Sequence, residues 1–115
     1  MTPGRFNFTC PQGTTFDTTL TWKIENTPVD VSGYSARLQV RETYNSEDYI
    51  VNLTNLNGGI TLGGSAGTIN LLINATDTSN FVIGDHVYDL ELISGNTTVT
   101  RLIEGRFNVT PEVTR

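Results

Sequence analysis

The sequence contains little of what catalytic and metal sites are usually built from. Among 115 residues there is one cysteine, Cys10, and one histidine, His86. A single cysteine cannot form a disulfide within the chain, which excludes the disulfide frameworks of small secreted domains. A catalytic thiol or a bound metal needs further suitable side chains, and neither residue has them nearby in the sequence. We therefore expect no enzyme activity, no catalytic residues, no cofactor and no metal. Cys10 is expected to be buried, and His86 to be a polar residue at a strand edge.

Long apolar runs and clusters of basic residues are also missing. No segment approaches the roughly 18 consecutive apolar residues that a membrane-spanning helix requires, and residues 1–5 lack the apolar core of a signal peptide. The seven Lys and Arg residues are scattered, and twelve Asp and Glu residues give a net charge of −5. Surfaces that bind nucleic acid are usually basic. These patterns predict a protein that is made in a cytoplasm and binds neither membranes nor nucleic acid.

Glycine, threonine and asparagine are plentiful, whereas apolar residues make up only 37% of the sequence. Threonine favours strands, and glycine and asparagine favour turns. A chain of 115 residues fits one domain. The composition therefore predicts a single domain over residues 1–115 that is made of short strands and tight turns, with flexible ends at 1–4 and 111–115.

Alternation of apolar and polar residues predicts strands with one buried face over 16–24, 34–41 and 86–94. Residues 43–48 are polar and predict a loop. In all, turn signals separate seven to eight short strands spaced about 8–12 residues apart, and no long helical repeat is present. The predicted fold is an all-β, antiparallel β-sandwich of the immunoglobulin-like type. Its expected core includes Phe16, Leu20, Trp22, Leu38, Val40, Tyr88, Leu90 and Leu92, with Ile24 continuing the first alternating strand.

A pair of carboxylates, Asp89 and Glu91, lies on the opposite face of the strand that carries Tyr88 and Leu90. Paired carboxylates can bind a metal or act as acid and base. Exposed Asp and Glu on the polar face of a sheet are much more common. We therefore expect a solvated face, on which Arg101 or Arg41 from a neighbouring strand could form an ion pair.

Short segments along nearly the whole chain combine into a recognisable pattern. The segments are 13–17 with 20–22, 28–37, 59–62 with 67–69, 84–92, 99–105 and 109–115. They resemble the small β-sandwich proteins encoded in the tail modules of tailed bacteriophages. The chain is also similar to the N-terminal domain of phage baseplate upper proteins. Those domains carry, in the same order, an opening strand, a Val-Asp-Val-Ser-Gly-Tyr turn (here 29–34), a glycine-rich middle and a Gly-x-x-x-Tyr-Asp-Leu-Glu-Leu strand (here 84–92).

The resemblance implies a structural protein of the virion, located in the tail region and made in the cytoplasm of the bacterial host. Such proteins bind other tail, baseplate or fibre proteins through strand edges and loops, in several symmetric copies. Baseplate upper proteins continue into receptor-binding parts, whereas this sequence ends at Arg115. A stand-alone tail-fibre connector or a decoration piece is therefore expected. We expect Arg5, Arg106 and Arg115, which flank the two ends of the chain, to contact other proteins.

Two other functions stay open from the sequence. A capsid decoration or head-fibre protein could use a similar sandwich. A carbohydrate-binding module could present aromatic rings to a host glycan, because rings offer an apolar stacking surface. The carbohydrate alternative requires Trp22 to be exposed beside Tyr44 or Tyr49, and it fails if Trp22 packs in the core.

Overall fold

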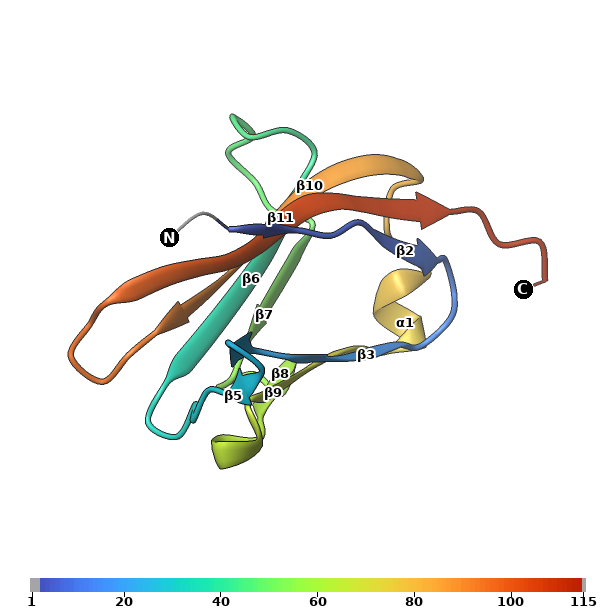
Figure 1. Cartoon of the computed structure of the whole chain (residues 1–115). Coiled ribbons are helices and arrows are strands. Elements are labelled where there is room, and N and C mark those ends of the chain that lie inside the picture. The colour runs from blue at the N-terminus through green and yellow to red at the C-terminus, as the bar shows by residue number, and fades with distance from the viewer. Residues whose placement is uncertain (1–2, 115) are drawn as a thin grey trace.

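The structure is a computed structural model that describes residues 3–114, and it confirms the predicted all-β fold (Figure 1). Two short helical segments interrupt the strands: the 3-10 turn η1 (Gly64–Ala66) and the helix α1 (Ala75–Thr78). Neither is long and apolar enough to cross a membrane. The strands are β1 (Gly4–Arg5), β2 (Phe8–Pro11), β3 (Phe16–Thr21), β4 (Lys23–Ile24), β5 (Thr27–Pro28), β6 (Ser35–Arg41), β7 (Val51–Thr54), β8 (Ile60–Leu62), β9 (Thr68–Ile73), β10 (Gly84–Ile93) and β11 (Val99–Thr110).

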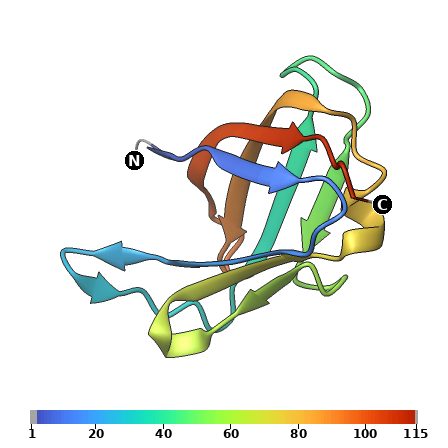
Figure 2. The same cartoon turned by 90° about the vertical axis from the view of Figure 1, so that its right-hand side faces the viewer.

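The strands form two main sheets that face each other across the core (Figure 2). The larger sheet has the order β1-β11-β10-β6-β7, with β2 also paired to β11, and the smaller sheet has the order β3-β9-β8. A separate hairpin, β4-β5, projects from the body of the molecule. The N-terminal strands β1 and β2 run parallel to β11, whereas the other strand pairs of the two main sheets are antiparallel.

The number of strands also exceeds the seven to eight expected from the sequence. Over residues 3–114 the chain forms eleven strands, because β1 and β2 precede the first strand expected from the sequence and because the short strands β4 and β5 have two residues each. The β4-β5 turn has Glu25 at φ 50° and Asn26 at φ 68°. Two successive residues with positive φ are typical of the type I′ turn that joins closely paired strands. The predicted strand over 16–24 therefore ends at Thr21, and the chain turns into this hairpin.

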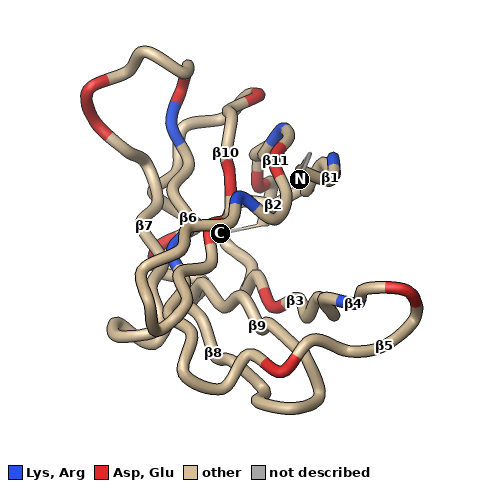
Figure 3. Tube along the Cα trace, turned by 60° about the vertical axis from the view of Figure 1, so that its left-hand side comes forward, with Lys and Arg blue, Asp and Glu red and all other residues tan. Residues whose placement is uncertain are grey.

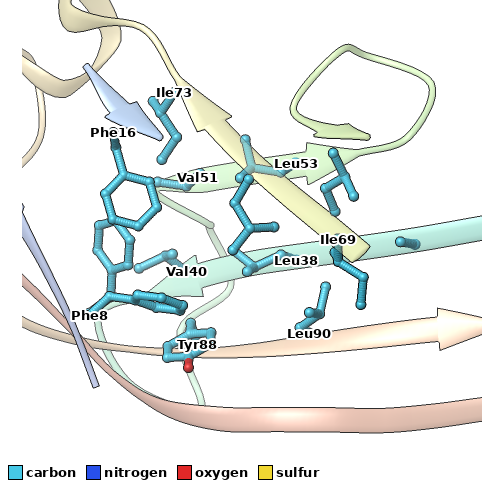
Figure 4. Packing of buried hydrophobic residues seen from close by; sticks show 14 of the residues in the cluster. Phe8, Phe16, Leu38, Val40, Val51, Leu53, Ile69, Ile73, Tyr88 and Leu90 are labelled. Carbon is cyan, nitrogen blue, oxygen red and sulfur yellow. The ribbon is translucent and has the colours of Figure 1, made fainter. Parts of the chain in front are cut away.

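The inner faces of the two sheets meet in one apolar core (Figure 4). Seven of the eight core residues predicted from alternation are buried, and Leu20 packs against them while partly exposed. Ile24 was expected on the same face, but it is 56% exposed because it lies in the projecting hairpin. The core also contains several residues that were not predicted from the sequence: Phe8, Val31, Ile60, Ile69, Leu71, Phe107 and Val109.

The single cysteine and the single histidine both lie inside the protein. Cys10 is fully buried, as expected, and burial raises the pKa of its thiol to about 11. A thiol with such a pKa stays protonated at neutral pH and is a poor nucleophile. His86 was expected at a polar strand edge, but this is wrong: it is buried, and its Nε2 atom lies 2.7 Å from the carbonyl oxygen of Val82. His86 thus holds the chain that enters β10.

The ends that were expected to be flexible, 1–4 and 111–115, lie only partly within the described residues. Gly4 already belongs to β1 and pairs with Ile103. After β11 ends at Thr110, the chain leaves the sheet, although the backbone N–H of Glu112 donates to the side chain of Gln12 at 3.3 Å. Residues 1, 2 and 115 lie outside the described residues.

Candidate functional site

The outer face of the larger sheet carries a network of ion pairs over a shallow hollow of about 550 Å³. Arg101 on β11 lies 3.4 Å from Asp89, which confirms one of the two pairings expected for this carboxylate. Arg41, the other expected partner, instead bonds the side chain of Gln39 and the backbone of the loop after β6. Three more pairs extend the network: Arg37–Glu91 at 2.8 Å, Arg101–Glu104 at 3.7 Å and Arg5–Glu104 at 3.4 Å.

Asp89 lies in the middle of this network, and its pKa is raised above the ordinary value of 3.8. Partial burial is the largest cause, and the negative charge of Glu91 adds to it, whereas Arg101 acts in the opposite direction. Burial disfavours the ionised form of a carboxyl group. The ion pair with Arg101 therefore offsets only part of the cost of keeping Asp89 charged in the fold.

The Asp89→Asn variant should be more stable than the wild type at pH 7. The pKa of Asp89 in the folded protein lies above its ordinary value of 3.8. Stability from this group is therefore fully present below about pH 3.8 and is lost as the pH rises through the folded pKa. Urea denaturation at pH 3, 5 and 7 should show an advantage for the variant that shrinks toward pH 3. Asp85→Asn, at an exposed position of the same strand, is the control. An advantage that is absent at pH 7, or that does not change with pH, would contradict this explanation.

At one edge of the larger sheet, β1 and β11 bring together Arg5, Phe6 and Arg106, which we call the basic edge. Arg5 pairs with Glu104 in the strand register, and the backbone N–H of Phe6 donates to the Glu104 carbonyl at 3.1 Å. The backbone N–H of Arg106 donates to the side chain of Asn7 at 2.9 Å. The structure therefore places two of the three arginines predicted to contact other proteins beside each other. The third, Arg115, lies outside the described residues.

Phe6 is the exposed apolar residue of the basic edge. Its side chain is 51% exposed, and its ring packs edge-on against Phe8, with the ring centres 4.9 Å apart. The Tyr88 hydroxyl donates to the Phe6 carbonyl at 2.6 Å and so fixes the backbone beneath the ring. Sequence alternation would place Phe6 and Phe8 on the same face and bury both, so the pattern gave no sign of this exposed ring.

At the other edge of the larger sheet, the loop between β6 and β7 lies beside the chain that enters β10. They enclose a hollow of about 420 Å³. Tyr49 is 52% exposed and Val82 is 57% exposed, so apolar surface is open to solvent here. The Arg41 guanidinium donates to the backbone carbonyls of Ser46 and Glu47 and holds the loop in place. The residues of this acidic hollow are Glu42, Ser46, Glu47, Asp48, Tyr49, Ile50 and Val82.

The exposed backbone of β7, beside the acidic hollow, is capped by a side chain. Asn57 donates from Nδ2 to the Asn52 carbonyl at 2.9 Å, and its Oδ1 accepts from the backbone N–H of Thr54 at 3.0 Å. The side-chain amide thus makes the two hydrogen bonds that a neighbouring strand would otherwise offer. An unpaired edge strand has free N–H and C=O groups with which a strand of another chain can pair, and natural proteins commonly block such edges.

The burial of Trp22 tests the carbohydrate-binding alternative, which requires this side chain to be exposed. It is 8% exposed, and its ring packs perpendicular to the Tyr34 ring, with the centres 5.9 Å apart. Its indole N–H is buried and has no hydrogen-bond partner among residues 3–114. Trp22 therefore belongs to the core and does not form a stacking platform with the exposed Tyr44 or Tyr49.

No protein-family model matches the sequence. A comparison with curated proteins finds no match either. Among residues 3–114, no three His, Cys, Asp or Glu side chains are grouped so that they could hold a metal ion.

Proposed function

We propose that this protein is a structural component of a tailed-phage virion, a tail, baseplate or tail-fibre connector that acts through contacts with other virion proteins. The observation that carries the proposal is the pair of exposed surfaces at the two edges of the larger sheet. Each surface combines exposed apolar side chains with charged side chains, of positive sign at the basic edge and mostly negative sign at the acidic hollow. Exposed apolar surface with a polar rim is typical of protein–protein contact sites.

The chain segments described above support the tail location, because their order resembles that of tail-module proteins and of the N-terminal domain of baseplate upper proteins. The order of the strands supports an immunoglobulin-like sandwich, which is part of the proposal. In the smaller sheet β3-β9-β8 corresponds to strands B, E and D of that fold, and in the larger sheet β11-β10-β6-β7 corresponds to G, F, C and C′. A sandwich of this kind serves as a rigid support for edges and loops that bind partners.

Peptide mass spectrometry of purified phage particles, from a phage that carries this gene, tests the proposal. The protein is expected in the particles in a fixed ratio to the known tail proteins. Deletion of the gene should yield particles that lack a tail or fibre component, and expression of the gene from a plasmid should restore it. Complete particles that lack this protein would reject the proposal. Loss of a head component instead would point to capsid decoration.

A further inference from the structure

We propose that copies of this chain associate head to tail, with Phe6 of one copy entering the acidic hollow of the next and with Arg5 and Arg106 facing the carboxylates there. This inference rests on the proposed assembly function and names one partner for it, a second copy of the chain. It follows from the chemistry of the two surfaces, from their positions on the sheet and from the capped edge of β7.

The two surfaces are complementary in charge and in polarity. The basic edge has one exposed aromatic ring and two exposed arginines, of which Arg5 pairs with Glu104 and Arg106 makes no ion pair with any residue among 3–114. The acidic hollow has an apolar lining of Tyr49, Ile50 and Val82 next to three carboxylates. Complementary charges around an apolar contact favour the correct partner and its orientation. Figure 3 shows the acidic residues of the β6–β7 loop at the upper left and β1 farther to the right, with β10 and β11 between them.

The register of the strands places the two surfaces at the ends of one row across the larger sheet. The row runs through the paired residues of β1, β11, β10, β6 and β7, which are Arg5, Glu104, Asp89, Gln39 and Asn52. Asn52 lies two residues from Ile50 of the hollow. Surfaces at opposite edges cannot meet within one copy, but they can meet between successive copies. Such a contact joins two different surfaces, and its repetition builds a ring or a filament.

The cap on β7 determines how the copies would meet. Because Asn57 occupies the carbonyl of Asn52 and the N–H of Thr54, a strand from another chain cannot pair with this edge unless Asn57 leaves. The contact therefore runs through side chains, with an aromatic ring in an apolar hollow, and not through an extended sheet. Buried aromatic anchors of this kind commonly supply most of the binding energy of an interface.

Sedimentation-velocity ultracentrifugation of the purified full chain tests this proposal. The wild type should form species larger than a monomer as its concentration rises, and added NaCl should weaken them because salt screens exposed charges. Arg106→Glu alone and Glu47→Arg alone each place like charges together, and each should raise the dissociation constant at least about tenfold. An equimolar mixture of these two variants should associate again, because the reversed edge of one then faces the reversed hollow of the other.

Two further variants separate the contact from general effects of charge and folding. Phe6→Ala should weaken association at least about tenfold, because it removes the apolar anchor. Lys23→Glu makes the same change of charge as Arg106→Glu on the projecting hairpin and should leave association unchanged. Circular dichroism should show that every variant is folded. A wild type that stays monomeric, or association that survives both single reversals, would overturn the proposal.

The result of the sedimentation experiment is independent of the result of the mass spectrometry on phage particles. A chain that is present in particles but monomeric when purified would reject the head-to-tail contact and leave the virion function standing. A chain that associates as described but is absent from particles would reject the virion function and leave the contact standing.

Discussion

Replacement of Trp22 by alanine should lower the free energy of unfolding by about 3–5 kcal/mol, the usual cost of emptying a large aromatic site in a core. Trp22 connects the smaller sheet to the β4-β5 hairpin. Its backbone N–H donates to the Gly67 carbonyl at 2.9 Å, and its carbonyl accepts from Val29 at 2.9 Å. Loss of the ring would leave Tyr34 without its perpendicular partner. Urea denaturation followed by circular dichroism measures the loss.

Two other variants make this measurement specific. Trp22→Phe should cost clearly less than Trp22→Ala, because it keeps an aromatic ring and removes the indole N–H, which is buried without a partner. Leu56→Ala removes a large side chain that is 91% exposed and should change stability very little. A loss below about 1 kcal/mol for Trp22→Ala would place Trp22 outside the core and would reopen the carbohydrate-binding alternative.

Replacement of Gly105 by alanine should detach the N-terminal strands from β11. A Cβ atom at this position would overlap the carbonyl oxygen of Phe6 and lie 2.9 Å from the carbonyl carbon of the same residue. Backbone cannot move aside as a flexible side chain can, so we expect a loss of about 1–3 kcal/mol, the usual cost of overpacking. Hydrogen exchange of the Phe6 amide, which is bonded to Glu104 in the wild type, should become faster.

Gly95→Ala is the matched control for this substitution. Its Cβ atom would lie 3.8 Å from the nearest backbone atom, an ordinary contact, and its φ is not positive. This variant should change stability by well under 1 kcal/mol, as is usual for surface substitutions. If Gly105→Ala were as stable as Gly95→Ala and protected the Phe6 amide equally well, the close contact between β11 and the N-terminal segment would be wrong. Because the contact positions Phe6, Gly105→Ala should also weaken self-association.

The central strands could be predicted from the sequence because each keeps one face in the core along its whole length. In β10, Tyr88, Leu90 and Leu92 are all buried, as a period of two requires. The same holds for Leu38 and Val40 in β6. Alternation is a reliable signal where a strand has neighbours on both sides and packs against a second sheet.

The edges could not be predicted in this way, because their conformation depends on partners distant in sequence. Alternation groups Phe6 with Phe8, but the pairing with β11 is interrupted at residues 6 and 7 between β1 and β2, and only Phe8 is buried in the core. Alternation likewise groups Ile24 with Trp22, but the positive φ values after Ile24 create a hairpin that leaves the sheet.

The candidate surfaces could be predicted only in part from the sequence, because they too depend on partners distant in the sequence. Proximity to the chain ends indicated Arg5 and Arg106, but the parallel pairing of β1 with β11 that brings them together leaves no local pattern. The acidic hollow combines a polar loop at 42–50 with Val82, which is held by the buried His86. Such a site depends on tertiary contacts between segments more than 30 residues apart in the sequence.

Cryo-electron microscopy of intact particles, from a phage that carries this gene, tests the central claim most directly. The account predicts density that fits residues 3–114 at the tail end or at the root of the fibres, repeated around the tail axis. Successive copies should be joined through the basic edge of one and the acidic hollow of the next. Particles without such density, or density only on the capsid lattice, would contradict the proposed role in the tail.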